Sequence, residues 1–399
     1  MQAVRPFHVP IKRLPRPQDV HNGAAATEIQ NVSIEDLIAR APVGLDELPV
    51  RRLIEGRSVL VTGAGGSIGS ELCRQIAALK PATLVLYERY ENNLFAIATD
   101  LADRGNVDRI HPVIGDVTDA QRVDTVMAQY RPDIVFHAAA HKHVPLMEHN
   151  VCEAVKNNVT GSRLMVEAAE RHGVDRFILI SSDKAVNPTS VMGATKRIAE
   201  SYCQAKGAER EARRRTHFIT VRFGNVLGSS GSVVPLFQRQ IAAGGPVTVT
   251  HPEVSRFFMT TREAVELVLQ ASALGAREEE PSIFVLDMGT PIRIADLARQ
   301  MIRLAGRQPV RDIAIQFTGL RPGEKLHEAL FHDGERRGDA GLAGLHRAFS
   351  RPLDAAMVAR QVDELGAAAR AGLTPRTLAL IGALVPEYHA DETTRRAAT

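Results

Sequence analysis

Two serines, an aspartate and a lysine occupy residues 181–184 and could carry proton chemistry. Asp183 can donate a proton if its carboxyl stays neutral, and Lys184 can accept one if its amine stays neutral. Burial favours the neutral form of both groups, so an active-site location predicts that both pKa values move in these directions. An isolated Asp–Lys pair is usually a solvated ion pair, but this one follows a predicted strand. Ser182 could hydrogen-bond a substrate oxygen.

A glycine-rich loop follows the apolar run Val59–Thr62 and predicts a dinucleotide site. Gly63 permits a tight turn, Gly66 lets the backbone approach a pyrophosphate, and Gly69 allows close packing of helix on strand. The helix that begins here offers free N–H groups and a positive dipole end to phosphates. A purely structural turn is the alternative. The loop residues expected at the cofactor are Gly63, Gly65, Gly66, Ser67, Ile68 and Gly69.

The ends of the next strands carry residues suited to the rest of the dinucleotide. Glu88 ends the second strand, where a carboxylate accepts hydrogen bonds from a ribose and repels a 2′-phosphate, which favours NAD. Arg89 beside it leaves NADP open, because an arginine can pair with that phosphate. Further contacts are expected from Asp116 and Val117, near the adenine, and from Ala138 and Ala139, which leave room for the cofactor.

Short apolar runs alternate with helical segments from Arg57 onward, which predicts a Rossmann-type doubly wound α/β fold with a parallel sheet covered on both faces. The predicted strands are Ser58–Thr62, Thr83–Tyr87, Arg109–Ile114, Ile134–His137, Phe177–Ser181 and Phe218–Phe223. The predicted helices are Ile68–Leu79, Asn92–Ala102, Gln121–Tyr130, Val151–His172 and Val191–Ala212.

The rest of the chain divides into an arm, a lobe and an extension. Residues 1–50 are expected to form an N-terminal arm with a short capped helix at Ser33–Arg40, and residues 51–335 are expected to form the main domain. Its dinucleotide part spans 57–223, and its smaller substrate lobe spans 224–335. The lobe is expected to hold helices Val233–Ala243, Arg262–Leu274 and Ile294–Leu304 and strands Ile283–Asp287 and Ile313–Phe317. Residues 336–399 are expected to be a helical extension.

Composition excludes several classes of function. The chain of 399 residues has 49 Lys plus Arg against 46 Asp plus Glu, and this balance argues against a nucleic-acid partner. No apolar run reaches the roughly 18 residues of a membrane span, and no signal peptide is evident. Cys73, Cys152 and Cys203 show no metal-ligand spacing, so we expect no metal and reduced thiols in a cytoplasmic protein.

These motifs together resemble the extended short-chain dehydrogenases/reductases, and within them the UDP-N-acetylglucosamine 4,6-dehydratases of polysaccharide biosynthesis. The similarity covers roughly residues 35–330. It is carried by Thr62–Gly69, His137–Pro145, Ser181–Lys196, Arg222–Pro235, Arg256–Thr260 and Arg321–Lys325. The resemblance implies a UDP-sugar substrate, tightly bound and recycled NAD, and a homo-oligomer.

Met192 departs from the superfamily's Tyr-x-x-x-Lys pattern, although Lys196 is in place to bind the nicotinamide ribose. A thioether has no titratable proton, so Met192 cannot do the tyrosine's work. The large-type branch of the dehydratases also carries Met here. The resemblance then assigns the acid that protonates the departing hydroxyl on carbon 6 to Asp183, and the base that takes the carbon 5 proton to Lys184.

The resemblance also indicates substrate contacts. The segment from His141 to Pro145 is expected to pack on the sugar, with Lys142 near it. One of Asn157 and Asn158 is expected to fix the backbone of the site. Arginine forks bind phosphates bidentately, which suits a diphosphate. The substrate-binding residues expected are Lys142, His143, Asn157, Asn225, Arg256, Arg321 and Glu324.

Two other functions stay open. A nucleotide-sugar 4-epimerase or reductase would share the cofactor loop, but it performs no elimination and has no use for Asp183 and Lys184. A catalytically silent NAD-binding regulatory protein would explain Met192 alone. Large members of the family carry upstream membrane helices and a further domain, and residues 1–50 resemble the tail of that region, so the chain is either a fragment or a short form.

Overall fold

The computed structural model describes residues 12–13, 30–31, 47–105, 107–209, 216–275, 283–349 and 354–389. The helix predicted at Ser33–Arg40 lies outside these residues, as does the end of the helix predicted at Val191–Ala212. In the arm, β1 (Lys12–Arg13) pairs with β2 (Gln30–Asn31) in antiparallel fashion.

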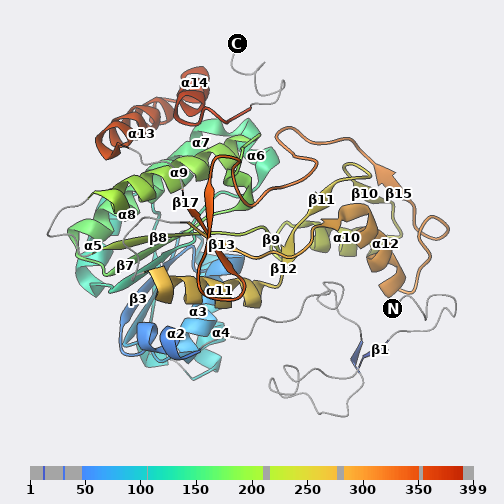
Figure 1. Cartoon of the computed structure of the whole chain (residues 1–399). Helices are drawn as coiled ribbons and strands as arrows, with labels where there is room; N and C mark the ends of the chain where they lie inside the picture. The colour runs from blue at the N-terminus through green and yellow to red at the C-terminus, as the bar shows by residue number, and fades with distance from the viewer. Residues whose placement is uncertain are drawn as a thin grey trace.

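A nine-stranded sheet forms the centre of the molecule, in the order β16-β17-β13-β8-β7-β6-β3-β4-β5 (Figure 1). All neighbours from β13 to β5 are parallel, whereas β17 is antiparallel to β13 and to β16. Its strands are β3 (Ser58–Thr62), β4 (Thr83–Glu88), β5 (Ile110–Ile114), β6 (Ile134–His137), β7 (Arg176–Ile180), β8 (His217–Arg222), β13 (Ile283–Leu286), β16 (Arg336–Asp339) and β17 (Leu345–Phe349). The predicted doubly wound fold is confirmed. Its strand order reverses between β3 and β6, the point at which such sheets bind ligands.

Helices cover both faces of the sheet because the central strands are apolar on both sides. One face carries α2 (Glu47–Ile54), α3 (Ser67–Ala78), α4 (Glu91–Asp103) and α11 (Thr261–Leu274). The other carries α5 (Ala120–Tyr130), α6 (Val144–His149), α7 (Val151–Val155), α8 (Ser162–Arg171) and α9 (Val191–Ala208). Each face has its own apolar core.

The helix predicted over Val151–His172 is interrupted by a π-helical segment, Lys156–Gly161. Such segments widen the helix locally and occur often at functional sites. Here the segment carries Asn157 and Asn158, both of which are buried.

The smaller lobe has a separate core around Phe237 and Val247. It contains α10 (Val233–Ala242), α12 (Ile294–Leu304), the parallel pair β10 (Val247–Val249) and β15 (Ile315–Phe317), and the antiparallel pair β11 (Ser255–Arg256) and β14 (Ile292–Arg293). Parallel strands β9 (Asn225–Val226) and β12 (Phe258–Met259) connect it to the sheet. The prediction that placed α11 and β13 in this lobe is wrong, because after Met259 the chain returns to the main sheet.

The prediction of helix throughout residues 336–399 is also wrong. Strands β16 and β17 extend the main sheet, with Leu345 and Ala348 buried. Only then do α13 (Ala355–Arg370) and α14 (Thr374–Leu384) follow, and they pack on α7 and α9. The Ala- and Arg-rich composition conceals the alternation that makes a strand.

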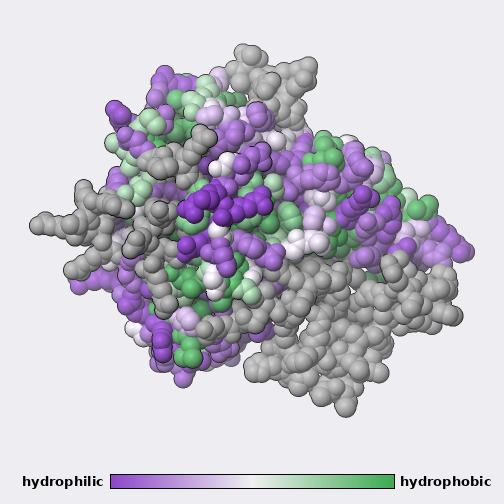
Figure 2. All heavy atoms as spheres, viewed as in Figure 1, coloured by the Kyte–Doolittle hydropathy of each residue, from purple (hydrophilic) through white to green (hydrophobic). Residues whose placement is uncertain are grey.

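In the part of the chain described, no helix has the length and apolar character needed to cross a bilayer. The face drawn in Figure 2 mixes hydrophilic and hydrophobic residues over both lobes.

Candidate functional site

The glycine loop has the geometry of a phosphate cradle. Gly63 adopts a φ of +64°, and the turn is closed by the hydrogen bond from Gly66 N to Gly63 O at 2.9 Å. A Cβ on Gly69 would lie 2.0 Å from Gly63 O, and one on Gly65 would lie 2.4 Å from Asn93 Cβ. Gly66 begins α3 without a side-chain cap. The first N–H groups of this helix are therefore available to a ligand, and the loop fits a dinucleotide pyrophosphate.

Glu88 is brought directly against this loop. Its buried carboxylate accepts hydrogen bonds from Gly65 N at 3.1 Å, Arg89 N at 2.9 Å and Tyr90 N at 3.0 Å. The Arg89 guanidinium instead lies 3.4 Å from the Asp116 carboxylate and over the Tyr90 ring. The acid at the end of β4 thus faces the loop while the neighbouring arginine is engaged elsewhere.

The other predicted cofactor residues lie around the same loop. Ser67 accepts a hydrogen bond from Ser230 N at 3.2 Å, which links the loop to the smaller lobe. Ala138 N and Ala139 N donate to the main-chain and side-chain oxygens of Thr62. Val117 is buried beside the π-helical segment, where a Cβ on Gly161 would meet it at 2.8 Å.

A buried hydrogen-bond chain under the loop was not predicted from the sequence. His137 bridges Thr62 Oγ1 at 2.8 Å and Ser162 Oγ at 3.0 Å, and Ser162 donates to Asn158 O. Burial lowers the pKa of His137 to about 3, so the ring is neutral. The chain joins the ends of β3 and β6 to the π-helical segment. The polar residues buried within otherwise apolar strands were the available signal.

Asn158 fixes the backbone of the site. Its side chain accepts from His141 N at 2.8 Å and donates to His141 O at 2.9 Å and Thr195 Oγ1 at 3.0 Å. Asn157 is buried and donates to Asn158. It is not among the residues that line the cleft between the main sheet and the smaller lobe. Of the two asparagines, Asn158 has the geometry expected of the backbone anchor.

Asp183 and Lys184 form a close pair at the end of β7. Lys184 Nζ lies 3.0 Å from Asp183 Oδ1 and 3.0 Å from Asn225 Oδ1, and Ser182 Oγ donates to Asp183 Oδ1 at 3.0 Å. Asp183 has no solvent exposure, and its Oδ2 has no hydrogen-bond partner among the described residues. A Cβ on Gly224 would lie 3.1 Å from that oxygen.

The proton states of this pair follow from burial and charge. Burial raises the pKa of Asp183 and outweighs the opposing effect of Lys184, as predicted. Burial would lower the pKa of Lys184, but the carboxylates of Asp183 and Glu328 outweigh it and the pKa lies above its ordinary value. The expectation that desolvation makes Lys184 neutral is therefore wrong, because two carboxylates face the ammonium.

Met192 and Lys196 lie one turn apart on α9, which is capped by Ser190. Met192 is buried in the apolar core of this face. Lys196 Nζ donates to Ile180 O at 2.9 Å, and burial lowers its pKa to about 8. Met192 thus fills space, whereas Lys196 presents a cation at the end of β7.

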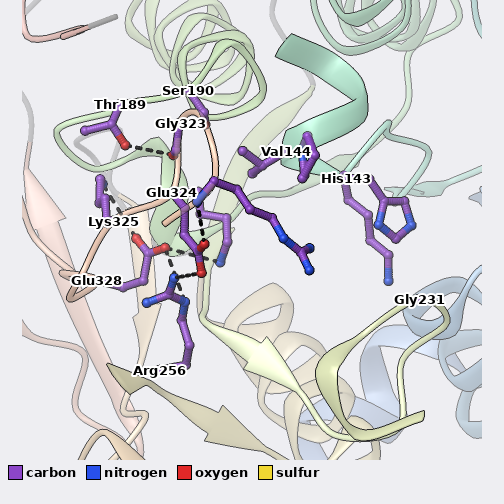
Figure 3. A pocket seen from close by; sticks show the side chains of 14 residues that line it. His143, Val144, Thr189, Ser190, Gly231, Arg256, Gly323, Glu324, Lys325 and Glu328 are labelled. Atoms are coloured by element: carbon purple, nitrogen blue, oxygen red, sulfur yellow. Dashed lines mark hydrogen bonds and ion pairs between the residues drawn. The ribbon is translucent and has the colours of Figure 1, made fainter. Parts of the chain in front are cut away.

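A cleft of about 210 Å³ lies between the main sheet and the smaller lobe. Its lining has five basic and two acidic side chains, so it favours an anionic ligand. His143 closes one side, where Gly231 packs so closely that a Cβ would lie 2.5 Å from the imidazole (Figure 3). The lining residues are Lys142, His143, Val144, Pro145, Lys184, Thr189, Ser190, Gly231, Arg256, Arg321, Gly323, Glu324, Lys325 and Glu328.

The two predicted arginines both line this cleft but differ in burial and in the partners of their side chains. Arg256 is buried and donates to Glu324 Oε1 at 2.9 Å and Ser255 O at 2.7 Å. Arg321 is exposed, and its backbone N donates to Glu324 Oε2 at 3.2 Å. Glu324 therefore holds both segments together, and a phosphate at Arg256 would compete with it.

Two further features of the site were not predicted from the sequence. Glu328 lies 3.7 Å from Lys184 Nζ, with its side chain 3% exposed. Beside the Ser181–Lys184 segment, the buried Arg222 pairs with Glu200 and Glu335, and Ser181 donates to Glu200 at 2.6 Å. These acids come from segments far apart in the sequence, so spacing gave no signal for them.

No group of three or more His, Cys, Asp or Glu side chains within the described residues is arranged to hold a metal ion.

Comparison with known proteins identifies relatives. Residues 59–348 match the family described as polysaccharide biosynthesis protein. The chain is 47% identical over 375 residues to the probable polysaccharide biosynthesis protein EpsC of Bacillus subtilis, covering 94% of this chain and 61% of that protein. It is 32% identical to a UDP-N-acetylglucosamine 4,6-dehydratase (inverting) of Campylobacter jejuni, covering 70% of this chain and 78% of that protein.

Two other similarities bear on the fold and on the rival function. The chain is 33% identical to a UDP-glucose 4-epimerase of Rickettsia typhi, covering 73% of this chain and 82% of that protein. The X-ray structure of Pen from Bacillus thuringiensis superimposes with a TM-score of 0.68 at 33% identity, covering 74% of this chain and 90% of that one.

Proposed function

Because this chain belongs to the polysaccharide biosynthesis protein family, whose model spans residues 59–348, we propose that it is a nucleotide-sugar 4,6-dehydratase with recycled NAD. UDP-N-acetylglucosamine is the proposed substrate, as in the name of the Campylobacter relative. The chain spans 61% of the length of EpsC, and the activity is proposed for this chain alone.

The buried Asp183 carboxyl is the observation that carries this proposal. An elimination needs a group that protonates the departing hydroxyl on carbon 6. Burial raises the pKa of Asp183, and its unpartnered Oδ2 offers a place for the proton. An epimerase has no departing hydroxyl and no use for such an acid.

Lys184 is the proposed base for the proton on carbon 5. Its ammonium is held by Asp183, Asn225 and Glu328, so it must lose a proton before it can act. Ser182, which donates to Asp183, is the proposed partner of the oxygen on carbon 4. Met192 takes no part in proton transfer, since it is buried in the core.

The cofactor site is proposed from the fit of the Gly63–Gly69 cradle and Glu88. When bound, the nicotinamide would supply the acceptor and later the donor of one hydride. Glu88 would accept hydrogen bonds from the hydroxyls of the adenosine ribose. Lys196 would bind the nicotinamide ribose at the end of β7. Close glycine packing at Gly65 and Gly69 keeps side chains out of the loop.

The substrate's diphosphate is proposed to bind in the basic cleft. Arg321 and Lys142 are exposed there, and Arg256 becomes available if the phosphate replaces Glu324. Arginine forks suit this bidentate exchange. His143 lines the same space. Asn225 and Asn157 remain proposed contacts, Asn225 through its hydrogen bond from Lys184 and Asn157 through Asn158.

Mass spectrometry tests the proposal. Purified protein is incubated with UDP-N-acetylglucosamine and catalytic NAD, and a product lacking one water is expected. NADH should not accumulate in proportion to product, because the hydride returns to carbon 6. An unchanged substrate mass, or stoichiometric NADH, would contradict the dehydratase.

A UDP-sugar 4-epimerase is the second candidate, and the 33% identity to the Rickettsia protein favours it. An epimerase leaves the mass unchanged but produces a second sugar with a distinct chromatographic retention. Chromatography of the same reaction therefore separates the two functions.

A further inference from the structure

We propose that Glu328 is a positioning residue of this site: its buried carboxylate, supplied by the 321–328 loop, holds the Lys184 ammonium against Asp183 and sets the pH range in which the pair works. The inference rests on the proposed function, in which Asp183 and Lys184 are the acid and the base. It adds a second carboxylate, from a segment remote in sequence, to their chemistry.

Glu328 reaches the Lys184 ammonium from a segment other than the one that carries Asp183. Glu328 Oε1 lies 3.7 Å from Lys184 Nζ, and the Glu328 side chain is almost fully buried in the cleft wall (Figure 3). Among the described residues the ammonium therefore donates hydrogen bonds to Asp183 and Asn225 and forms a longer ion pair with Glu328. Two of these come from elements other than its own, so the ammonium is held from several directions.

The 321–328 loop is itself docked on the catalytic segment. Lys325 Nζ donates to Val186 O at 2.6 Å, and Thr189 Oγ1 donates to Gly323 O at 3.0 Å. Gly323 has a φ of +72°, and a Cβ there would lie 2.8 Å from Ser190 Cβ. The close approach of these two backbones fixes where Glu328 stands.

The charges around Glu328 come from each element packed on it. Lys325 Nζ lies 3.6 Å from Oε2, and Arg256 Nε lies 3.9 Å from Oε1. Burial would raise the pKa of Glu328, but Lys184, Lys325 and Arg256 outweigh it and the pKa lies below its ordinary value. Glu328 is thus ionised beside Lys184, whose cationic neighbours are Arg256, Lys142 and Lys325.

A fixed negative charge at this point acts on both partners in the same direction. It stabilises the Lys184 ammonium and disfavours the Asp183 carboxylate, so it raises the pKa of each group. The base then works only at higher pH, and the acid keeps its proton to higher pH. Both limbs of a bell-shaped rate profile should be displaced toward alkaline pH by Glu328.

The test is the pH dependence of kcat/KM in Glu328→Gln. Both limbs should move toward acidic pH by roughly one to three units, the usual effect of removing a charge at this distance. Glu328→Asp, which keeps the charge on a shorter stem, should lie between the two profiles. Glu324→Gln is the matched control: it removes a carboxylate from the same loop that contacts Arg256 rather than Lys184. Because the phosphate then no longer competes with the Glu324 carboxylate for Arg256, KM should fall while both limbs stay in place.

A second readout needs no turnover. Lysine acetylation by acetic anhydride, followed by peptide mass spectrometry across pH, reports the titration of Lys184, with Lys80 in the turn after α3 as internal reference. The Lys184 midpoint should fall in Glu328→Gln. Unmoved limbs together with an unmoved midpoint in both Glu328 variants would overturn the inference. If the wild-type protein dehydrates no substrate but the Lys184 midpoint is still lower in Glu328→Gln than in wild type, the proposed function is refuted and the role of Glu328 stands.

Discussion

Met192 and Lys196 lie one helical turn apart on α9, yet the thioether is buried in the apolar core while the lysine Nζ donates to Ile180 O at 2.9 Å. The position that most of the superfamily gives to a proton-exchanging tyrosine is thus a packing position here. On the proposed function, the proton chemistry comes from the end of β7, where Asp183 and Lys184 lie.

Substitutions should separate these roles. Met192→Leu removes only shape and polarisability and should cost under ~1.5 kcal/mol of stability with turnover retained. Asp183→Asn and Lys184→Met should each slow turnover roughly 10²- to 10⁴-fold while NAD affinity is kept. Solvent deuterium incorporation at carbon 5 should fall most in Lys184→Met. An active Lys184→Met beside an inactive Met192→Leu would reverse the assignment.

Cofactor choice should depend on Glu88. The wild-type protein should bind NAD more tightly than NADP, because the carboxylate faces the loop while Arg89 is engaged by Asp116 and Tyr90. Glu88→Ala should weaken NAD binding by roughly 10- to 100-fold, the effect of losing hydrogen bonds to a charged group. Titration calorimetry with both cofactors checks this. Tighter NADP binding by the wild type would mean that Arg89 governs the pocket.

Lys196 should make the cofactor-free protein more stable in alkali. The folded state lowers the pKa of Lys196 from 10.5 to about 8 through burial. Between these values the unfolded chain binds the extra proton, so the free energy of unfolding rises with pH, by up to on the order of 3 kcal/mol. Urea unfolding from pH 7 to 10 measures the rise. Lys196→Met should flatten it, and an equal rise in the variant would assign it to other groups.

Arg222 should be among the most sensitive structural positions. Arg222→Met leaves the buried Glu200 and Glu335 without their shared cation and should lower the free energy of unfolding by ~3–5 kcal/mol. Arg262→Met, which breaks an exposed ion pair with Glu266, should cost under ~1 kcal/mol.

The same network should shape acid stability. The pKa of Glu200 is lowered from 4.5 to about 2, although burial opposes the shift, because Arg222 lies beside it. Its contribution is present above pH 4.5 and should be lost as pH falls from there to about 2. Denaturant unfolding of wild type and Arg222→Met over this range should converge as the pH falls.

Local patterns predicted the features that local physics determines. Apolar runs ending in Thr62 or His137 identified parallel strands, and the Gly63–Gly69 spacing identified the turn before α3. The end of each strand is the same edge of the sheet, so the positions of Glu88 and Asp183 followed without coordinates. These elements are fixed by neighbours in sequence.

Contacts between residues far apart in the sequence could not be predicted from local patterns. Nothing near Glu328 in sequence indicates that Lys184 lies 3.7 Å away. Strand β17 pairs with β13 across more than fifty residues, and its Ala- and Arg-containing sequence resembles helix. Lys184 was predicted to be neutral because burial was considered without the two carboxylates that tertiary structure brings to it.

The segment after α14 has a consequence for synthesis of the chain. His389 N donates to Pro188 O at 3.1 Å, and Glu387 pairs with Arg197, so residues beyond 384 brace the loop that follows Lys184. The ribosome synthesises these residues some two hundred residues after the loop that they contact. During translation this loop therefore lacks its outer support although the sheet beneath it can already form. On the proposed function, a chain that ends before residue 385 should fold over most of its length and convert substrate slowly.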